Sequence, residues 1–200
     1  METFRYAHLP PDVSHVHVAL FTNVANAAQI RARIIKAATA AGPEGELERE
    51  AVNFAFIDAR LICSVLHLQT AIVQAVLAEV QGSLRTKTVH AEILWALSPN
   101  NNITEAIRRF GVSDTTAALF VVRIAPPDLG DVQARMLAVV SGDISPIGDL
   151  GQFTDWASVK KYYKLNGEPA LKESGLDVAQ EHLIVDEIVT SSVAMKSVMA

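Results

Sequence analysis

The chain has almost no cysteine and no long uninterrupted apolar run, and each of these features excludes some classes of protein. Cys63 is the single cysteine, so no internal disulfide can form, and a reducing compartment fits best. The longest apolar segment, residues 61–80, is interrupted by serine, histidine, glutamine, threonine and glutamate. We therefore expect a soluble protein of the nucleus and cytoplasm that has no membrane partner.

The chain also has no large excess of charge of one sign, since its formal net charge is only −5 at pH 7. This balance gives the whole molecule no attraction for nucleic acid, so any such binding needs a local basic patch. Hydrophobic residues make up 50% of the chain and charged residues 20%, which is the composition of a folded globular protein. The length predicts one domain over residues 1–200.

Short catalytic signatures are absent from the sequence. It contains no glycine-rich phosphate loop, no nucleophile elbow, no His-Glu-x-x-His and no Cys-x-x-Cys. This absence favours binding over catalysis. We expect a protein without enzymatic activity of its own and without a cofactor.

Histidines are the residues that a metal site or a general base would most often use. His15 and His17 lie two residues apart on a predicted strand, hence on one face, but no nearby cysteine or histidine completes a metal site. We therefore expect no metal. His67 and His90 have no sequence-local carboxylate that orients the ring, and surface or supporting roles are favoured for both. The alternative function is a small metabolic enzyme or ligand-binding domain in which one of these two serves as a base.

Hydrophobic periodicity predicts a compact α/β fold in which helices flank a small mixed or antiparallel sheet. The segment "AALFVVRI" is the strongest strand signal. The acidic residues 42–50 are expected to form an exposed, flexible insertion loop. The predicted strands are residues 14–21, 53–58 and 117–124, and the predicted helices are residues 27–41 (with Asn23 or Asn26 as the cap), 61–80, 89–97, 103–110, 133–140, 156–165 and 178–195.

Three consecutive asparagines precede one predicted helix, in the segment "SPNNNITEAIRRFG" at residues 98–111. Asn102 can cap this helix, with Glu105 three residues later as in a capping box. Asn100 and Asn101 are not needed for that purpose. They lie at a helix N-terminus, where exposed amides favour an anion such as a phosphate.

A basic turn lies one helix earlier in the chain and carries Arg85 and Lys87. If it converges with the asparagine segment, the two together offer positive charges and amides to a phosphate backbone or a single-stranded nucleotide. The alternative is a solvated turn beside an ordinary capped helix.

The last predicted helix carries an apolar side formed by Ile184, Val185, Ile188 and Val189, which Leu183 flanks. No later element remains to cover this side. It therefore either packs in the core or serves as an interface with a partner.

Several segments, in this order and with compatible spacing, resemble one known family. They are "NVANAAQIRARI" from residue 23, "LRTKTVHAEILWALSPNNNITEAIRRFGV" at residues 84–112 and "VKKYYKL" at residues 159–165. They are similar to the kinase-binding subunit of the KEOPS complex, also called EKC, which is the family of the animal PRPK-binding protein, TPRKB. The chain resembles a fungal-type member. The resemblance covers residues 12–165 and, more loosely, the last helix.

The resemblance implies a non-catalytic subunit that binds the small lobe of a kinase-like ATPase and stimulates it. That assembly makes threonylcarbamoyl-adenosine beside the anticodon of tRNAs. In the family this subunit also helps to capture tRNA through its single-stranded 3′ CCA end. The fungal complex is further linked to telomere maintenance.

The same resemblance implies two sets of contact residues. The residues expected to contact tRNA are Arg85, Lys87, Asn100, Asn101, Asn102 and Ile103. The residues expected to face the kinase are Tyr162, Leu183, Ile184 and Ile188. Two segments depart from the family pattern: residues 42–50 form a longer acidic insertion, and residues 176–196 extend the usual short terminal helix into an interface helix.

Overall fold

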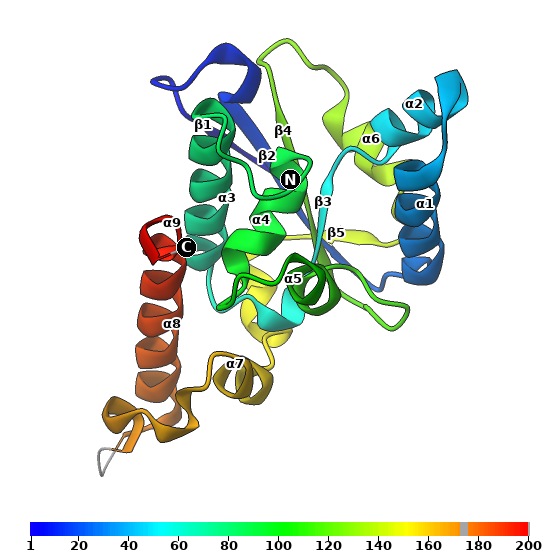
Figure 1. Cartoon of the computed structure of the whole chain (residues 1–200). Coiled ribbons are helices and arrows are strands. Elements are labelled where there is room, and N and C mark those ends of the chain that lie inside the picture. The colour runs from blue at the N-terminus through cyan, green and yellow to red at the C-terminus, as the bar shows by residue number, and fades with distance from the viewer. Residues whose placement is uncertain (173–175, 200) are drawn as a thin grey trace. The chain divides into compact units, whose positions relative to one another are not determined.

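The computed structural model of the chain describes residues 1–172 and 176–199 (Figure 1). The contacts between residues group the chain into two compact units. Unit 1 consists of Met1–Asp58 and Gly111–Ile147, and unit 2 consists of Ala59–Phe110 and Gly148–Ala200. Each unit is thus assembled from two separate stretches of the chain. The single domain expected over residues 1–200 stays a prediction.

Unit 1 contains a five-stranded antiparallel sheet. Four strands follow the order β1-β2-β4-β3, and β5 pairs with β2. Val18 of β2 lies opposite Val122 of β4, which pairs with Ala55 of β3 on its other side. The strands are β1 (Glu2–Arg5), β2 (His15–Thr22), β3 (Ala55–Asp58), β4 (Leu119–Ala125) and β5 (Asp143–Ser145).

The core of unit 1 joins this sheet to two helices, α1 (Ala27–Thr39) and α6 (Val132–Leu137). A third helix, α2 (Gly42–Ala51), packs on α1. Phe21 of β2 and Val121 of β4 belong to one buried cluster with Ile30 of α1 and Met136 of α6. Every residue of β4 is buried, including Arg123, as its otherwise apolar sequence predicts for a strand covered on both faces. The predicted α/β class, with an antiparallel sheet and flanking helices, is confirmed.

Asn26 occupies the position before α1 but does not cap it through its side chain. Its Nδ2 donates to the carbonyl oxygen of Val139, and its Oδ1 accepts from the backbone N–H of Ser141, both at 2.9 Å. The sequence therefore located the start of the helix, whereas the asparagine side chain fastens the segment after α6.

The prediction of a flexible loop at residues 42–50 is wrong, because this segment forms the helix α2. Glutamate is a good helix former, and Pro43 lies in the first turn, where the missing N–H costs nothing. Two hydrogen bonds from Arg33 of α1 to the carboxylate of Glu48, at 2.7 and 3.2 Å, hold α2 against α1. Arg49 adds hydrogen bonds to backbone carbonyls at the end of α1. Whether the segment is an insertion stays a prediction.

The remaining helices belong to unit 2. Ser64 caps α3 by accepting the backbone N–H of His67, so this helix begins after the 3₁₀ turn at Ala59–Leu61 rather than at residue 61. The helices are α3 (Val65–Val80), α4 (Val89–Leu97), α5 (Ile103–Phe110), α7 (Trp156–Tyr162), α8 (Val178–Ala194) and α9 (Lys196–Met199). The other short 3₁₀ helices of the chain are Pro11–Val13, Ile147–Gln152, Leu165–Gly167 and Pro169–Lys172.

Helix α8 packs along α3, so of the two alternatives left open for its apolar side, packing in the core holds for its valines. The buried stripe of α8 is Val185, Val189 and Val193, spaced four residues apart. Gln74 of α3 donates to the carbonyl oxygen of Ala194 at 2.9 Å and fixes the end of α8. The valines therefore belong to the core of unit 2. Within the described residues, no helix is long and apolar enough to cross a membrane.

We predict that Val189→Ala lowers the free energy of unfolding by about 2–3 kcal/mol, because it removes two buried methyl groups and leaves a cavity against α3. Leu183→Ala is the matched control on the same helix. Since Leu183 is 59% exposed, this change should cost less than about 0.5 kcal/mol. Urea unfolding measures both values. Equal effects of the two substitutions would contradict the packing of α8 on α3.

Candidate functional site

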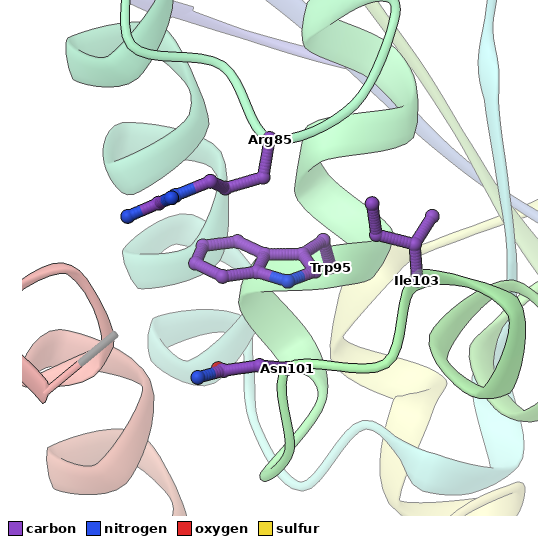
Figure 2. Close-up of a pocket in the computed structure, with 4 residues that line it drawn as sticks. All are labelled: Arg85, Trp95, Asn101 and Ile103. Carbon is purple, nitrogen blue, oxygen red and sulfur yellow. The ribbon is translucent and has the colours of Figure 1, made fainter.

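A surface pocket of about 170 Å³ in unit 2 is lined by Arg85, Trp95, Asn101 and Ile103 (Figure 2). Arg85 comes from the turn before α4, Trp95 from α4 itself, and the other two from the loop and first turn of α5. Figure 2 shows the Arg85 side chain on one side of the indole ring and Asn101 on the opposite side. The basic turn and the asparagine segment therefore do converge, as the sequence suggested.

The sequence interpretation missed Trp95, whose ring forms the centre of this pocket. Trp95 lies in the middle of the apolar run "EILWALS" and is only 7% exposed, so periodicity alone places it in the core. A tryptophan flanked in sequence by a basic turn and an asparagine loop is a weak signal for such a site, because aromatic rings often provide stacking surfaces for nucleotide bases.

The basic turn is held by a buried carboxylate rather than simply solvated. Glu92 of α4 is 1% exposed, and its oxygens accept the backbone N–H groups of Arg85 at 3.0 Å and Thr86 at 2.7 Å. The Thr86 hydroxyl donates to the same carboxylate at 2.6 Å. Such charge-assisted hydrogen bonds fix the backbone of the turn. The side chains of Arg85 and Lys87 remain exposed.

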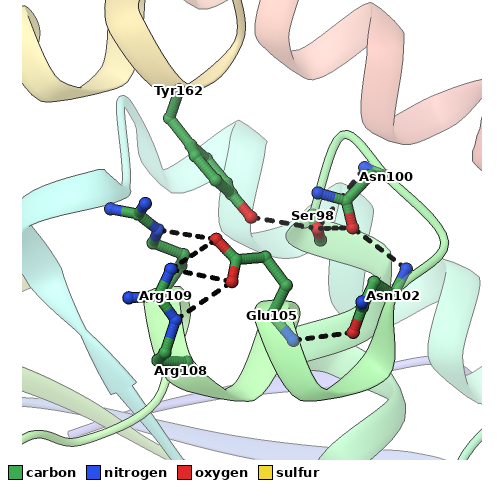
Figure 3. A network of polar contacts seen from close by, with 7 residues as sticks. All are labelled: Ser98, Asn100, Asn102, Glu105, Arg108, Arg109 and Tyr162. Carbon is green, nitrogen blue, oxygen red and sulfur yellow. Dashed lines mark hydrogen bonds and ion pairs between the residues drawn. The ribbon is translucent and has the colours of Figure 1, made fainter.

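The three asparagines have different roles, and Figure 3 shows two of them, Asn100 and Asn102. Asn102 caps α5, since its Oδ1 accepts the N–H of Glu105 at 3.0 Å, which confirms the predicted cap. Asn100 was expected to be left over, but its Oδ1 accepts the N–H of Asn102 at 3.0 Å and closes the turn before the helix. Asn101 is the asparagine that lines the pocket.

Glu105 does not complete a capping box, because its side chain turns toward two arginines instead. It accepts hydrogen bonds from Arg108 and Arg109 at 2.7–3.0 Å, and these bonds lower the pKa of its carboxyl group. Arg109 also lies over the ring of Tyr162, 5.2 Å from its centre. The two arginines at the end of α5 are thus engaged with neighbours in unit 2.

The four residues expected at a kinase interface come from two helices, Tyr162 from α7 and the other three from α8. Tyr162 contacts the α5 side of unit 2: its ring lies edge-on to Phe110, and its hydroxyl is 3.3 Å from that of Ser98. Leu183 points away from the α8 core stripe and is exposed, whereas Ile184 and Ile188 are half-buried beside it. Their contact with a kinase stays a prediction.

Both isolated histidines are buried. Of the surface or supporting roles favoured for His67 and His90, the surface role is therefore wrong. His67 is 0% exposed; its Nδ1 accepts the N–H of Cys63 at 3.2 Å, which places the proton on Nε2, 3.4 Å from the hydroxyl of Tyr163. The Tyr163 hydroxyl in turn donates to the carbonyl oxygen of Leu97. Burial lowers the pKa of His67 to about 3. This neutral ring fastens the core of unit 2, and water cannot reach it as it would reach a general base in an open pocket.

The histidine pair on β2 does not form a metal cluster. His17 Nδ1 is 2.9 Å from the Thr3 hydroxyl, and His15 Nδ1 is 2.9 Å from the Ser14 hydroxyl. In the part of the chain that the structure describes, no three His, Cys, Asp or Glu side chains are placed to hold a metal ion.

Comparison with known proteins gives consistent matches over most or all of the chain. Residues 21–197 match the family model described as kinase binding protein CGI-121. A protein of Cryptococcus neoformans var. neoformans serotype D named EKC/KEOPS complex subunit CGI121 is 36% identical, over 100% of both chains. Proteins of the same name from Neurospora crassa and Gibberella zeae are 35% and 38% identical, over 90% and 84% of this chain and 89% and 84% of their own.

We predict that His67 makes folding sensitive to acid. Its pKa is lowered from 6.5 to about 3, so between these values the unfolded chain binds a proton that the folded protein excludes. This contribution to stability is complete above pH 6.5 and is lost as the pH falls toward 3. His67→Gln should therefore flatten the dependence of the unfolding free energy on pH, by up to about 1.4 kcal/mol per pH unit.

Urea unfolding at several values from neutral to mildly acidic pH measures this slope. His8→Gln is the matched control, because His8 is exposed and should leave the slope unchanged. A His67→Gln profile parallel to that of the wild type would show that the ring titrates freely in the folded protein.

Proposed function

Since the chain belongs to the kinase binding protein CGI-121 family, we propose that it is the kinase-binding subunit of an EKC/KEOPS complex. In this proposal it binds the small lobe of the kinase-like ATPase subunit, stimulates it, and helps to capture the 3′ CCA end of tRNA for threonylcarbamoyl-adenosine modification. It has no catalytic activity of its own and acts in the nucleus and cytoplasm. A linked role in telomere maintenance is part of the proposal.

The pocket around Trp95 is the observation that carries the nucleotide part of this proposal. It combines an aromatic ring, the exposed cation of Arg85 and the amide of Asn101. Sites for single-stranded nucleic acid use these groups: rings stack on bases, cations attract phosphates and amides bond to base edges. Lys87 lies two residues from Arg85 in the same anchored turn and adds a second positive charge.

The exposed side of α8 supports the protein-binding part of the proposal. Its valine stripe is fixed against α3, so the helix can present Leu183 without losing its own packing. Leu183 is 59% exposed, and Ile184 and Ile188 lie half-buried beside it. A rigid helix with exposed large aliphatic side chains suits a groove on a partner protein.

The mechanism that we propose is positional. The subunit stabilises the productive conformation of the kinase-like ATPase by binding that conformation more tightly than others. At the same time it holds the flexible tRNA end, which raises the local concentration of substrate. Neither step requires a reacting group on this chain.

Charge reversal tests the nucleotide surface. The double substitution Arg85→Glu and Lys87→Glu should weaken binding of labelled tRNA, and the slope of log affinity against log salt concentration should decrease by about 1.4, as expected for two lost phosphate contacts. Kinase binding should be unchanged. The same reversal at Arg31 and Lys36 of α1, both exposed, is the control and should leave tRNA affinity within about twofold. Unchanged tRNA binding in the first variant would reject the basic turn as a contact.

Substitutions on α8 test the kinase interface. Ile184→Glu should weaken binding to the kinase subunit of the same organism by at least about tenfold, because it buries a charge in an apolar contact. Leu183→Glu is the safer companion, since its exposed position tolerates the change in the free protein. Leu66→Glu on α3 is the matched control, because Leu66 is exposed to 61%. Titration calorimetry measures each affinity, and full binding by both α8 variants would move the interface elsewhere.

A further inference from the structure

Lys196, the first residue of α9, buries its ammonium group next to the Trp95 pocket. The residue is 7% exposed, although lysine is rarely buried unless it is paired. Its Nζ lies 4.4 Å from the centre of the Trp95 ring, which is the distance of a cation–π contact. A buried charge persists only where specific partners compensate for the loss of water.

Two backbone carbonyls of the asparagine segment provide that compensation. Lys196 Nζ donates to the carbonyl oxygens of Ser98 and Asn100, each at 2.6 Å. These two carbonyls bracket Pro99, so one ammonium group fixes the backbone on both sides of this residue. Burial lowers the pKa of Lys196 to about 8, and the group therefore remains protonated at neutral pH.

The contact extends from Lys196 to the first turn of α5 through a series of hydrogen bonds. Asn100, whose carbonyl Lys196 holds, accepts the N–H of Asn102, and Asn102 accepts the N–H of Glu105. Asn101 lies between the two held asparagines and lines the pocket. The position of Asn101 relative to the indole ring thus depends on Lys196, which contacts both the ring and the backbone beside Asn101.

Lys196 is itself fixed by the C-terminal helices. Gln74 of α3 bonds to the carbonyl oxygen of Ala194, two residues before Lys196. The buried valines of α8 fix the position of that helix along α3. The place of the ammonium group therefore follows from the packing of α8.

We propose that Lys196 is a positioning residue for the pocket and that it couples the C-terminal helices to the binding of a single-stranded RNA end. It holds Trp95 and residues 98–102 in the arrangement that receives a base, and it does not itself contact the ligand. This inference rests on the nucleotide part of the proposed function. It gives α9 a role in RNA binding that none of the pocket-lining residues reveals.

The test compares Lys196→Met with Lys196→Arg in the full chain. Methionine keeps an apolar stem against the indole but loses the charge and both hydrogen bonds, whereas arginine retains donors and charge. The probe is a labelled single-stranded RNA oligonucleotide ending in CCA, titrated at several salt concentrations. Lys161→Met on α7 is the matched control, because Lys161 is exposed in the same unit.

We expect Lys196→Met to bind the oligonucleotide roughly tenfold more weakly, with an unchanged salt slope, and Lys196→Arg to recover most of the affinity. An unchanged slope separates positioning from a phosphate contact, which would reduce it. Wild-type affinity in Lys196→Met would overturn the proposal, and so would a reduced slope.

Amide hydrogen exchange in the protein without RNA tests the positioning role of Lys196 separately from RNA binding. Lys196→Met should speed exchange of the amides of Asn102 and Glu105, whereas Lys161→Met should not. If the wild type binds no RNA, the nucleotide function is overturned for both proposals, and the exchange rates still decide whether Lys196 orders the loop. Unchanged exchange in Lys196→Met would overturn the positioning itself.

Discussion

The segments before and after α4 contain backbone polar groups that need hydrogen-bond partners. Two buried side chains of opposite charge, Glu92 of α4 and Lys196 of α9, provide them. Glu92 accepts the N–H groups of the turn before the helix, and Lys196 donates to the carbonyls of the segment after it. The attraction of Glu92 favours the charged form of Lys196. Removing either charged group would leave the other charge less compensated in this interior, which is costly.

In the proposed function, this arrangement would allow a small surface to bind a flexible ligand. Arg85 and Asn101 project from backbone segments that are fixed on two sides, and Trp95 lies on the helix between them. Little conformational entropy is then lost on binding, so a modest number of contacts is sufficient. The residues that supply the rigidity are buried. Of those that would supply recognition, Arg85 and Asn101 are exposed, whereas Trp95 is largely buried.

His67 and Cys63, two buried groups of unit 2, serve the structure rather than a reaction. His67 is held neutral between Cys63 and Tyr163, and burial raises the pKa of the Cys63 thiol as well. Groups poised for catalysis are reachable by substrate and have a pKa near the working pH. These groups have neither property, which agrees with a family whose description is kinase binding.

The sequence by itself determined the features that depend on neighbours in the chain. Alternation and continuous apolar runs located β2 and β4, and local chemistry predicted the Asn102 cap because its partner is three residues away. Features that depend on distant partners could not be found in this way. His67 lies on a helix edge that the sequence shows as polar, yet Tyr163 and the surrounding core bury it. Lys196 and Ser98 are 98 residues apart. Only the packing of α8 on α3 brings this ammonium group to the asparagine segment, where backbone carbonyl oxygens and an indole ring replace the water around it.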